Sequence, residues 1–210
     1  MIKSKERITE FGEVFTSERE VKAMLDLVYD ETLRIDSRFL EPACGDGNFL
    51  IEILRRKLRK VSERYSRNQT DYEKNAIIAV SSIYGIDILQ DNVADCADRL
   101  TSFTLKDYEK RYKDLNPKFI KTVRFIFSKN ILHGDATSLI IPDSDEPIIF
   151  SEWNFIGNSK IKRTEYTLAN IIAYQPFEGE NLFSDLGEEV FIPQPLRTYA
   201  LCHYLDVDNE

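Results

Sequence analysis

The chain has 210 residues, of which 42% are hydrophobic and 30% charged, and its net charge is -8. This composition is ordinary for a globular protein and excludes a disordered chain or a coiled coil as the main structure. The acidic balance also argues against a protein that holds DNA unaided, because contacts to phosphates rely on basic side chains.

Several features favour a soluble cytoplasmic protein. The longest apolar stretches, such as residues 76–80, are too short to cross a bilayer. The first residues lack the apolar core of a secretory signal. Cys44, Cys96 and Cys202 lie far apart, so we expect neither a disulfide framework nor a metal site.

The charge is unevenly distributed along the chain. Basic residues outnumber acidic ones in residues 51–74 and 101–130, whereas acidic residues dominate residues 135–210. Two interpretations are open. The basic runs are either solvated helix faces or a side that faces a polyanion, with the acidic tail contacting another protein.

The first predicted elements are a helix, a strand and a second helix. Residues 17–20 fit a capping box, and apolar residues then recur at helical spacing up to Val28. Residues 38–41 form a short apolar strand that ends in a turn of small residues, 43–47. The next helix carries one apolar face, made of Leu50, Leu54, Leu58, Val61 and Tyr65.

Strands and helices continue to alternate. A helix-like run leads into a strand over residues 83–87, and Asp91 is expected to cap the helix that follows. Residues 130–135 resemble a third strand, in which His133 is expected as a core histidine. A fourth strand lies between residues 148 and 156, and residues 190–195 form an extended segment broken by proline. This alternation predicts a mainly parallel sheet covered on both faces.

Three strand ends carry polar groups that suit a nucleotide-like ligand. In such sheets, ligands bind at the carboxyl ends of the strands. After the first strand, two glycines allow a tight turn, and Glu41 and Asp46 suit a ligand with an amino group and ribose hydroxyls. Asp87 ends the second strand, where it is expected to accept from a ribose while Ile88 lies against an adenine. Asp135 follows the third strand.

These residues also carry a family resemblance. The segment EPACGDGNFL at residues 41–50 resembles the S-adenosylmethionine (SAM) binding turn of bacterial DNA adenine methyltransferases of restriction–modification systems. GEVFT at residues 12–16 is similar to their N-terminal motif, although Ser17 stands where a proline is usual. Residues 84–87 and 134–136 match the second and third motifs.

The resemblance implies an α/β fold with a doubly wound, mainly parallel sheet of the class I SAM-dependent methyltransferase (Rossmann-like) type. It implies SAM as cofactor and S-adenosylhomocysteine as its product. The expected cofactor contacts are Phe15, Thr16, Glu41, Ala43, Gly45, Gly47, Phe49, Asp87, Ile88, Asp135 and Ala136.

We expect one methyltransferase-like domain over residues 1–210. It comprises a helical segment, 1–35, a cofactor-binding core, 36–161, and an acidic extension, 162–210. No candidate for a target recognition domain is found in the sequence. DNA is therefore expected to be contacted through a partner or specificity subunit.

The fourth motif of the family departs from its usual form. Its polar residue, two prolines and aromatic residue correspond here to Asn158, Ser159, Lys160 and Ile161. In one interpretation Asn158 still accepts from the adenine amine, and Trp153 or Tyr166 supplies the stacking ring. In that case the catalytic residues are expected at Asn158, Ser159 and Ile161, and the protein is an N6-adenine methyltransferase. In the other, the protein is an inactive cofactor-binding or scaffold subunit of a restriction–modification or defence complex.

Overall fold

The computed structural model describes residues 16–172 and 193–209. Phe15 and residues 190–192, which the sequence analysis singled out, lie outside the described residues. Within these ranges no helix is both long and apolar enough to span a membrane.

Three parallel strands form the sheet that the sequence predicts at the centre of the fold. They are β1 (Phe39–Glu41), β2 (Ile83–Asp87) and β3 (Ile131–His133), in the order β1-β2-β3. Phe39 pairs with Ile83, and Gly85 pairs with Ile131. All three predicted strands are confirmed, the first and the third over fewer residues than expected.

Two helices follow each of the first two strands. Helices α4 (Asn48–Tyr65) and α5 (Gln69–Ser81) connect β1 to β2, and α6 (Gln90–Glu109) and α7 (Pro117–Asn130) connect β2 to β3. The predicted apolar face of α4 is confirmed. Its residues Leu50, Leu54, Leu58 and Val61 are each at most 1% exposed, and Tyr65 is half-buried. The predicted cap of α6 is wrong, because Leu89 occupies the N-cap and Asp91 lies in the first turn.

An antiparallel sheet lies beside the parallel one. Strands β4 (Ile149–Ile156) and β5 (Lys160–Thr167) form a hairpin, and β6 (Arg197–Thr198) and β7 (Cys202–His203) both pair with β5. The predicted fourth strand therefore exists but does not join the parallel sheet. Gly157, with φ of +64°, lets the chain reverse at the hairpin turn. The expectation of a doubly wound sheet is thus only partly met: in the part of the chain that the structure describes, the parallel sheet has three strands.

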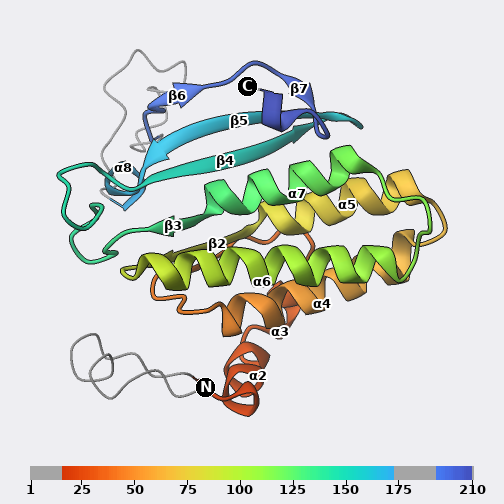
Figure 1. The fold of residues 1–210 in the computed structure, drawn as a ribbon, viewed down its shortest axis with the longest axis horizontal. Coiled ribbons are helices and arrows are strands. Elements are labelled where there is room, and N and C mark those ends of the chain that lie inside the picture. The colour runs from red at the N-terminus through yellow and green to blue at the C-terminus, as the bar shows by residue number, and fades with distance from the viewer. Residues whose placement is uncertain (1–15, 173–192, 210) are drawn as a thin grey trace, which may run out of the picture.

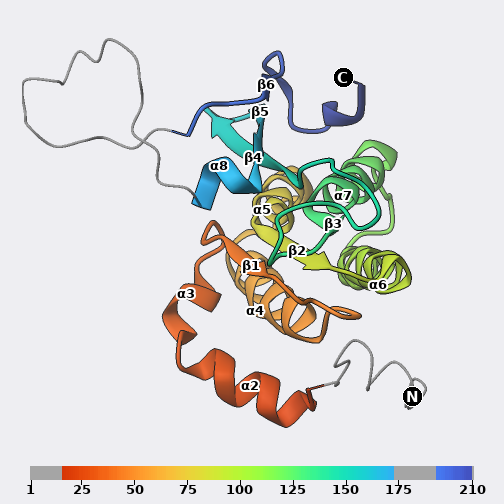
Figure 2. The ribbon, with the colours of Figure 1, turned by 90° about the vertical axis from the view of Figure 1, so that its left-hand side faces the viewer.

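The two sheets pack against each other on the face opposite α4 (Figure 2). The Tyr84 hydroxyl donates to the Ser151 carbonyl at 3.0 Å, and the Tyr84 and Phe150 rings meet edge to face. The Trp153 indole donates to Asn130 at the end of α7, at 2.8 Å. These contacts fix the hairpin on the core.

Strand β4 runs against the direction of β1–β3. Its beginning lies at their carboxyl ends, because a Cβ added at Gly134 would come within 2.4 Å of Ile148. Its later residues lie at their amino ends, where Glu152 pairs with Arg38 at 2.8 Å. The hairpin turn therefore lies at the opposite end of the parallel sheet from the glycine turn, which Figure 1 shows as the right-hand end of β4 and β5.

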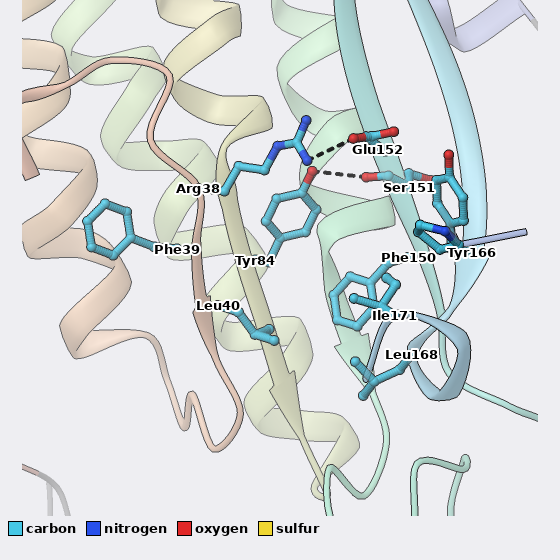
Figure 3. Close-up of a pocket in the computed structure, with 11 residues that line it drawn as sticks. Arg38, Phe39, Leu40, Tyr84, Phe150, Ser151, Glu152, Tyr166, Leu168 and Ile171 are labelled. Atoms are coloured by element: carbon cyan, nitrogen blue, oxygen red, sulfur yellow. Dashed lines mark hydrogen bonds and ion pairs between the residues drawn. The ribbon is translucent and has the colours of Figure 1, made fainter. Parts of the chain in front are cut away.

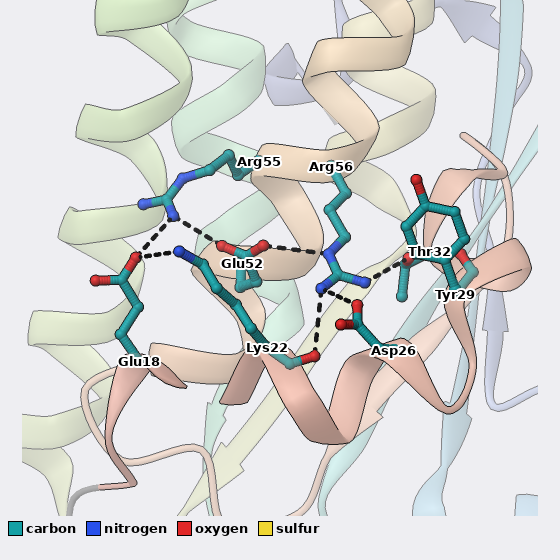
Figure 4. A network of polar contacts seen from close by, with 8 residues as sticks. All are labelled: Glu18, Lys22, Asp26, Tyr29, Thr32, Glu52, Arg55 and Arg56. Carbon is teal, nitrogen blue, oxygen red and sulfur yellow. Dashed lines mark hydrogen bonds and ion pairs between the residues drawn. The ribbon is translucent and has the colours of Figure 1, made fainter. Parts of the chain in front are cut away.

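Two short helices precede the core, α2 (Glu18–Asp26) and α3 (Tyr29–Leu33), and α8 (Leu168–Ile172) follows β5. The predicted capping box of α2 is present, with Ser17 and Glu20 bonded reciprocally. Arg56 of α4 ties α2 and α3 to the core, since it donates to Glu52, Asp26 and Thr32 (Figure 4).

Candidate cofactor site

The carboxyl ends of the three parallel strands bring Glu41, Asp87 and the turn before Asp135 to one edge of the sheet. Glu41 lies opposite Gly85, and Asp87 lies opposite His133. The Gly134 N–H donates to the Asp87 carbonyl at 3.0 Å, so the chain after β3 stays beside the end of β2. This edge is the place at which parallel α/β sheets bind ligands.

A tight turn connects β1 to α4. The Cys44 N–H donates to the Ile86 carbonyl at 2.8 Å, and the Gly47 N–H donates to the Cys44 carbonyl at 2.9 Å. Gly45 and Gly47 both have positive φ, +52° and +91°. A Cβ at Gly47 would lie 2.7 Å from the Cys96 sulfur, whereas a Cβ at Gly45 would meet nothing within 4 Å. Close packing against Cys96 therefore requires a glycine at position 47, whereas Gly45 borders open space.

The Asp87 carboxylate holds this turn together. It is 8% exposed and accepts hydrogen bonds from the Gly45 N–H at 2.8 Å, the Leu89 N–H at 2.9 Å and the Asn92 amide at 3.2 Å. A carboxylate offers about four acceptor positions. Three of them are engaged within the chain, so Asp87 has room for about one further donor rather than for two ribose hydroxyls.

Two more acids border the turn. Burial raises the pKa of Glu41, an effect that a hydrogen bond from the Ala43 N–H partly offsets. Asp46 pairs with Arg99 through one carboxylate oxygen at 2.6 Å, and Arg99 also donates to Asn48 at 3.1 Å. The other oxygen, Oδ1, is buried without a hydrogen-bond partner among the described residues. A buried acceptor without a partner, one residue after the open space at Gly45, suits a ligand that carries an amino group.

The side chains that follow β2 and β3 differ in how far they are free to contact a ligand. Ile88 is 42% exposed and free to lie against a flat ligand. Asp135 accepts from the Thr137 N–H and the Ser138 hydroxyl, both at 2.8 Å, and these bonds lower its pKa. Ala136 packs against the core, as Phe49 does at the start of α4. Asp135 therefore supports its own turn, the arrangement expected of an ordinary Asx turn.

His133 is not the core histidine that the sequence predicts. It is half-buried, and its Nε2 lies 3.0 Å from the Ile88 carbonyl. Among the described residues there is no group of three or more His, Cys, Asp and Glu side chains that would hold a metal ion.

Thr16 lies close to the same turn although it is distant in sequence. It lines a small pocket of about 160 Å³ together with Asn48, the first residue of α4, and Arg99 of α6. Helix α2 therefore brings the start of the described chain beside the glycine turn.

Comparison with protein families shows to which class of protein this site belongs. The family model described as "MmeI, DNA-methyltransferase domain" matches residues 15–175, more than half of the chain. The chain belongs to this family. No curated protein and no solved structure matches it.

The MmeI DNA-methyltransferase domain family comprises SAM-dependent DNA methyltransferases of restriction–modification enzymes, which agrees with the resemblance seen in the sequence. Membership also implies a Rossmann-like methyltransferase fold, and the parallel sheet that the structure describes consists of β1, β2 and β3.

The residues expected to form the fourth motif lie apart from the glycine turn. Asn158 and Ser159 occupy the β4–β5 turn and are exposed, and the Ser159 carbonyl accepts from the Tyr204 N–H at 3.0 Å. Ile161 is fully buried and pairs with Cys202 in the antiparallel sheet. The structure does not bring these three residues together with Asp87, and their catalytic role stays a prediction.

Two residues that contact the turn were not predicted as site residues from the sequence. Asn92 donates a hydrogen bond to the Asp87 carboxylate. Arg99 forms an ion pair with Asp46 and donates to the Asn48 side chain. The sequence shows only their place on the helix after Asp87, and not the groups that they contact. Asn92 and Arg99 lie two turns apart on the helix that follows Asp87, and a helix in that position runs back along the glycine turn.

Proposed function

We propose that this domain binds SAM at the carboxyl edge of β1–β3 and serves N6-adenine methylation of DNA with a partner that recognises the target. The observation that carries the proposal is the open space at Gly45, next in sequence to Asp46, whose Oδ1 has no hydrogen-bond partner among the described residues. The family membership supports the choice of SAM over other ligands with an amino group.

In this proposal each group at the turn has its own task. The acids Glu41 and Asp46 receive the ammonium end of the cofactor, and Ile88 lies against its adenine. Asp87 contributes mainly by fixing the Gly45 N–H, with one acceptor position left for a ribose hydroxyl. Bound SAM supplies an electrophilic methyl group that an adenine amine accepts directly, so no covalent intermediate on the protein is needed.

A second candidate function is cofactor binding without catalysis. It is favoured by the position of Asn158, which lies in the hairpin turn at the far end of the parallel sheet. In-line transfer requires the acceptor amine within about 3–3.5 Å of the methyl carbon. An amine held at Asn158 in the described arrangement does not meet that requirement.

The test of cofactor binding compares two glycines with the same local properties. Gly45 and Gly157 both have positive φ and open space at the Cβ position, but only Gly45 lies at the proposed site. We expect calorimetric titration to show that Gly45→Ala weakens SAM binding by roughly tenfold or more, while Gly157→Ala binds as the unsubstituted protein does. Equal affinities in both variants, or no binding to the unsubstituted protein, would reject the proposed site.

Methyl transfer separates the two candidates. Radiolabelled SAM is offered with DNA, with and without a cell extract that supplies partners. Label that enters adenine N6 only with the extract, and is lost in Asn158→Ala, supports the partner-dependent enzyme with a fourth motif at Asn158. Saturable SAM binding without transfer under any condition supports the non-catalytic function.

A further inference from the structure

Helix α7 differs from the rest of the chain in its charge. Its 14 residues include four basic side chains and no acidic one. The longer stretch that contains it, residues 101–130, carries eight basic and three acidic side chains, 8 - 3 = +5, in a chain whose net charge is -8. Positive charge is therefore concentrated on one segment of an otherwise acidic protein.

Three of the four basic residues of α7 lie on one side of the helix. Lys118, Lys121 and Arg124 follow one another at intervals of three residues, and all three are exposed. The opposite side is buried in the core and includes Phe119 and Ile126. We call the three exposed residues the basic face. It extends about 9 Å along the helix axis, since each residue adds about 1.5 Å.

Most of the charge on the basic face is not neutralised within the described part of the chain. Lys118 pairs with Asp206 at 2.6 Å, but neither Lys121 nor Arg124 has an ion-pair partner among the described residues. Like charges three positions apart on a helix repel each other and destabilise it. Basic side chains that gather on one helix face without acidic partners are the electrostatic pattern of a surface that binds a polyanion.

The rest of the surface around α7 indicates which polyanion fits. Of the twelve exposed large apolar residues in the described ranges, none belongs to α6 or α7. Leu40 and Ile171, for example, border an apolar pocket of about 390 Å³ that is built from other elements (Figure 3). Interfaces between proteins have an apolar core and few lysines, whereas contacts to a nucleic-acid backbone rely on Lys and Arg. The basic face therefore suits phosphate groups better than another protein.

The basic face is separate from the proposed cofactor site. Asn130, the last residue of α7, is followed directly by β3, so α7 precedes the amino end of the parallel sheet. Figure 1 shows α7 extending to the right of β3. The proposed cofactor site lies at the carboxyl ends of the same strands. A duplex that contacts α7 is thus held outside the place of methyl transfer.

We propose that the basic face binds the phosphate backbone of duplex DNA without reading its sequence. Salt at about 0.1 M screens charges beyond about 10 Å, so these side chains attract nearby phosphates although the whole chain is acidic. Such a contact raises the local concentration of DNA and leaves the choice of target to the partner. The inference rests on the proposed function for the identity of the polyanion, but the basic face does not depend on SAM binding.

The test measures the fluorescence anisotropy of a labelled DNA duplex of arbitrary sequence, titrated with the full chain at several salt concentrations. We expect a dissociation constant of roughly 10⁻⁴–10⁻⁶ M at physiological salt and tighter binding at lower salt. The double substitution Lys121→Gln with Arg124→Gln should weaken binding by roughly tenfold or more. It should also reduce the slope of log K against log salt by about 1.8, because each lost phosphate contact removes about 0.9.

The matched control removes two charges of the same sign from α4. Arg59 and Lys60 lie 3.8 Å and 2.8 Å from Glu63, so their charges already have a partner. The substitution Arg59→Gln with Lys60→Gln should leave the salt slope unchanged, because neither residue is proposed to contact phosphate. The exchange Lys121→Arg with Arg124→Lys keeps both charges on α7 and should bind DNA as the unsubstituted chain does.

Other results would overturn the proposal. They are the absence of binding at low salt, an unchanged salt slope when Lys121 and Arg124 are both replaced by Gln, and an equal loss in the α4 control, which would show an effect of net charge alone. Labelled polyglutamate that binds more tightly than the duplex, and is lost in the same α7 variant, would assign the face to an acidic protein instead. Calorimetry with SAM separates the two proposals, because DNA binding without SAM binding would reject only the proposed cofactor site.

Discussion

At the scale of single residues, Gly45 and Gly47 share a left-handed backbone but have different surroundings. An alanine at Gly45 adds only backbone strain, which costs about 1 kcal/mol. An alanine at Gly47 also drives its Cβ into the Cys96 sulfur, 2.7 Å away in the ideal position. We expect Gly47→Ala to lower the free energy of unfolding by roughly 2–4 kcal/mol, the strain plus the cost of overpacking. Urea unfolding of both variants measures the difference, and equal losses would contradict this account of the turn.

Lys57 is a buried lysine at the amino ends of β1 and β2. Its ammonium donates to the carbonyls of Ile35 and Ser37 and to the Ser82 hydroxyl, and it lies over the Phe39 ring. Burial lowers the pKa of Lys57 to about 7, although Asp36 and Glu31 act in the opposite direction. A lysine in an unfolded chain has a pKa of about 10.4.

Between these two pKa values the unfolded chain binds the extra proton, so stability rises with pH. The contribution of Lys57 to the free energy of unfolding should increase by at most about 1.4 kcal/mol per pH unit between pH 7 and 10, and should be flat below pH 7. In Lys57→Met this increase should disappear, whatever the variant's absolute stability. Denaturant unfolding across this pH range checks the difference, and parallel pH profiles of the two proteins would contradict it.

At the scale of elements, the attachment of α2 and α3 to α4 depends on two neighbouring arginines of unequal burial. Arg56 is 8% exposed and bonds to the buried Glu52, whereas Arg55 is 45% exposed and pairs with Glu52 and Glu18. Arg56→Ala removes one of the two partners of the buried Glu52 together with the bonds to Asp26 and Thr32, and should cost about 3 kcal/mol, the lower end for a broken buried pair. Arg55→Ala should cost about 1 kcal/mol or less, because the Arg55 guanidinium and its partner Glu18 are solvated and Glu52 keeps its bond to Arg56.

Limited proteolysis gives a second measurement of the same attachment. Because Arg56 also bonds to Asp26 and Thr32, its loss should speed cleavage within residues 18–34, and loss of Arg55 should not. Equal destabilisation by the two substitutions would show that burial does not govern this network.

The strands of the parallel sheet were predictable because each is a short apolar run that ends in a polar, glycine-containing or acidic turn. The apolar face of α4 was predictable because its residues recur at helical spacing. The β4–β5 hairpin was not predicted. The pair Gly157-Asn158 and the alternation of polar and apolar residues on both sides of it are typical of a hairpin, but the same residues also resemble the lead-in to a methyltransferase motif.

The supporting contacts of the site could not be predicted. Asn92 and Arg99 are ordinary polar residues of an amphipathic helix until the chain crossing places them against Asp87 and Asp46. Their role depends on tertiary packing, which spacing along the sequence does not contain.

At the scale of the whole molecule, two sheets share one core. Trp153 is the sole tryptophan and reports on the antiparallel sheet, while the helices that flank the parallel sheet dominate the circular dichroism signal. The contacts of Tyr84 with Ser151 and of Trp153 with Asn130 link the two sheets. We expect Trp153 fluorescence and circular dichroism to give coincident unfolding curves, as a two-state domain does. A fluorescence transition at lower denaturant would show that the hairpin unfolds separately.

The central claim is that the carboxyl edge of β1–β3, rather than the hairpin turn, receives SAM. Hydrogen exchange measured with and without SAM tests it most directly, because it reports each segment separately. We expect SAM to slow exchange in residues 41–49 and 86–92 and to leave residues 156–161 unchanged. Slowed exchange at residues 156–161 without any change at residues 41–49 would contradict the claim.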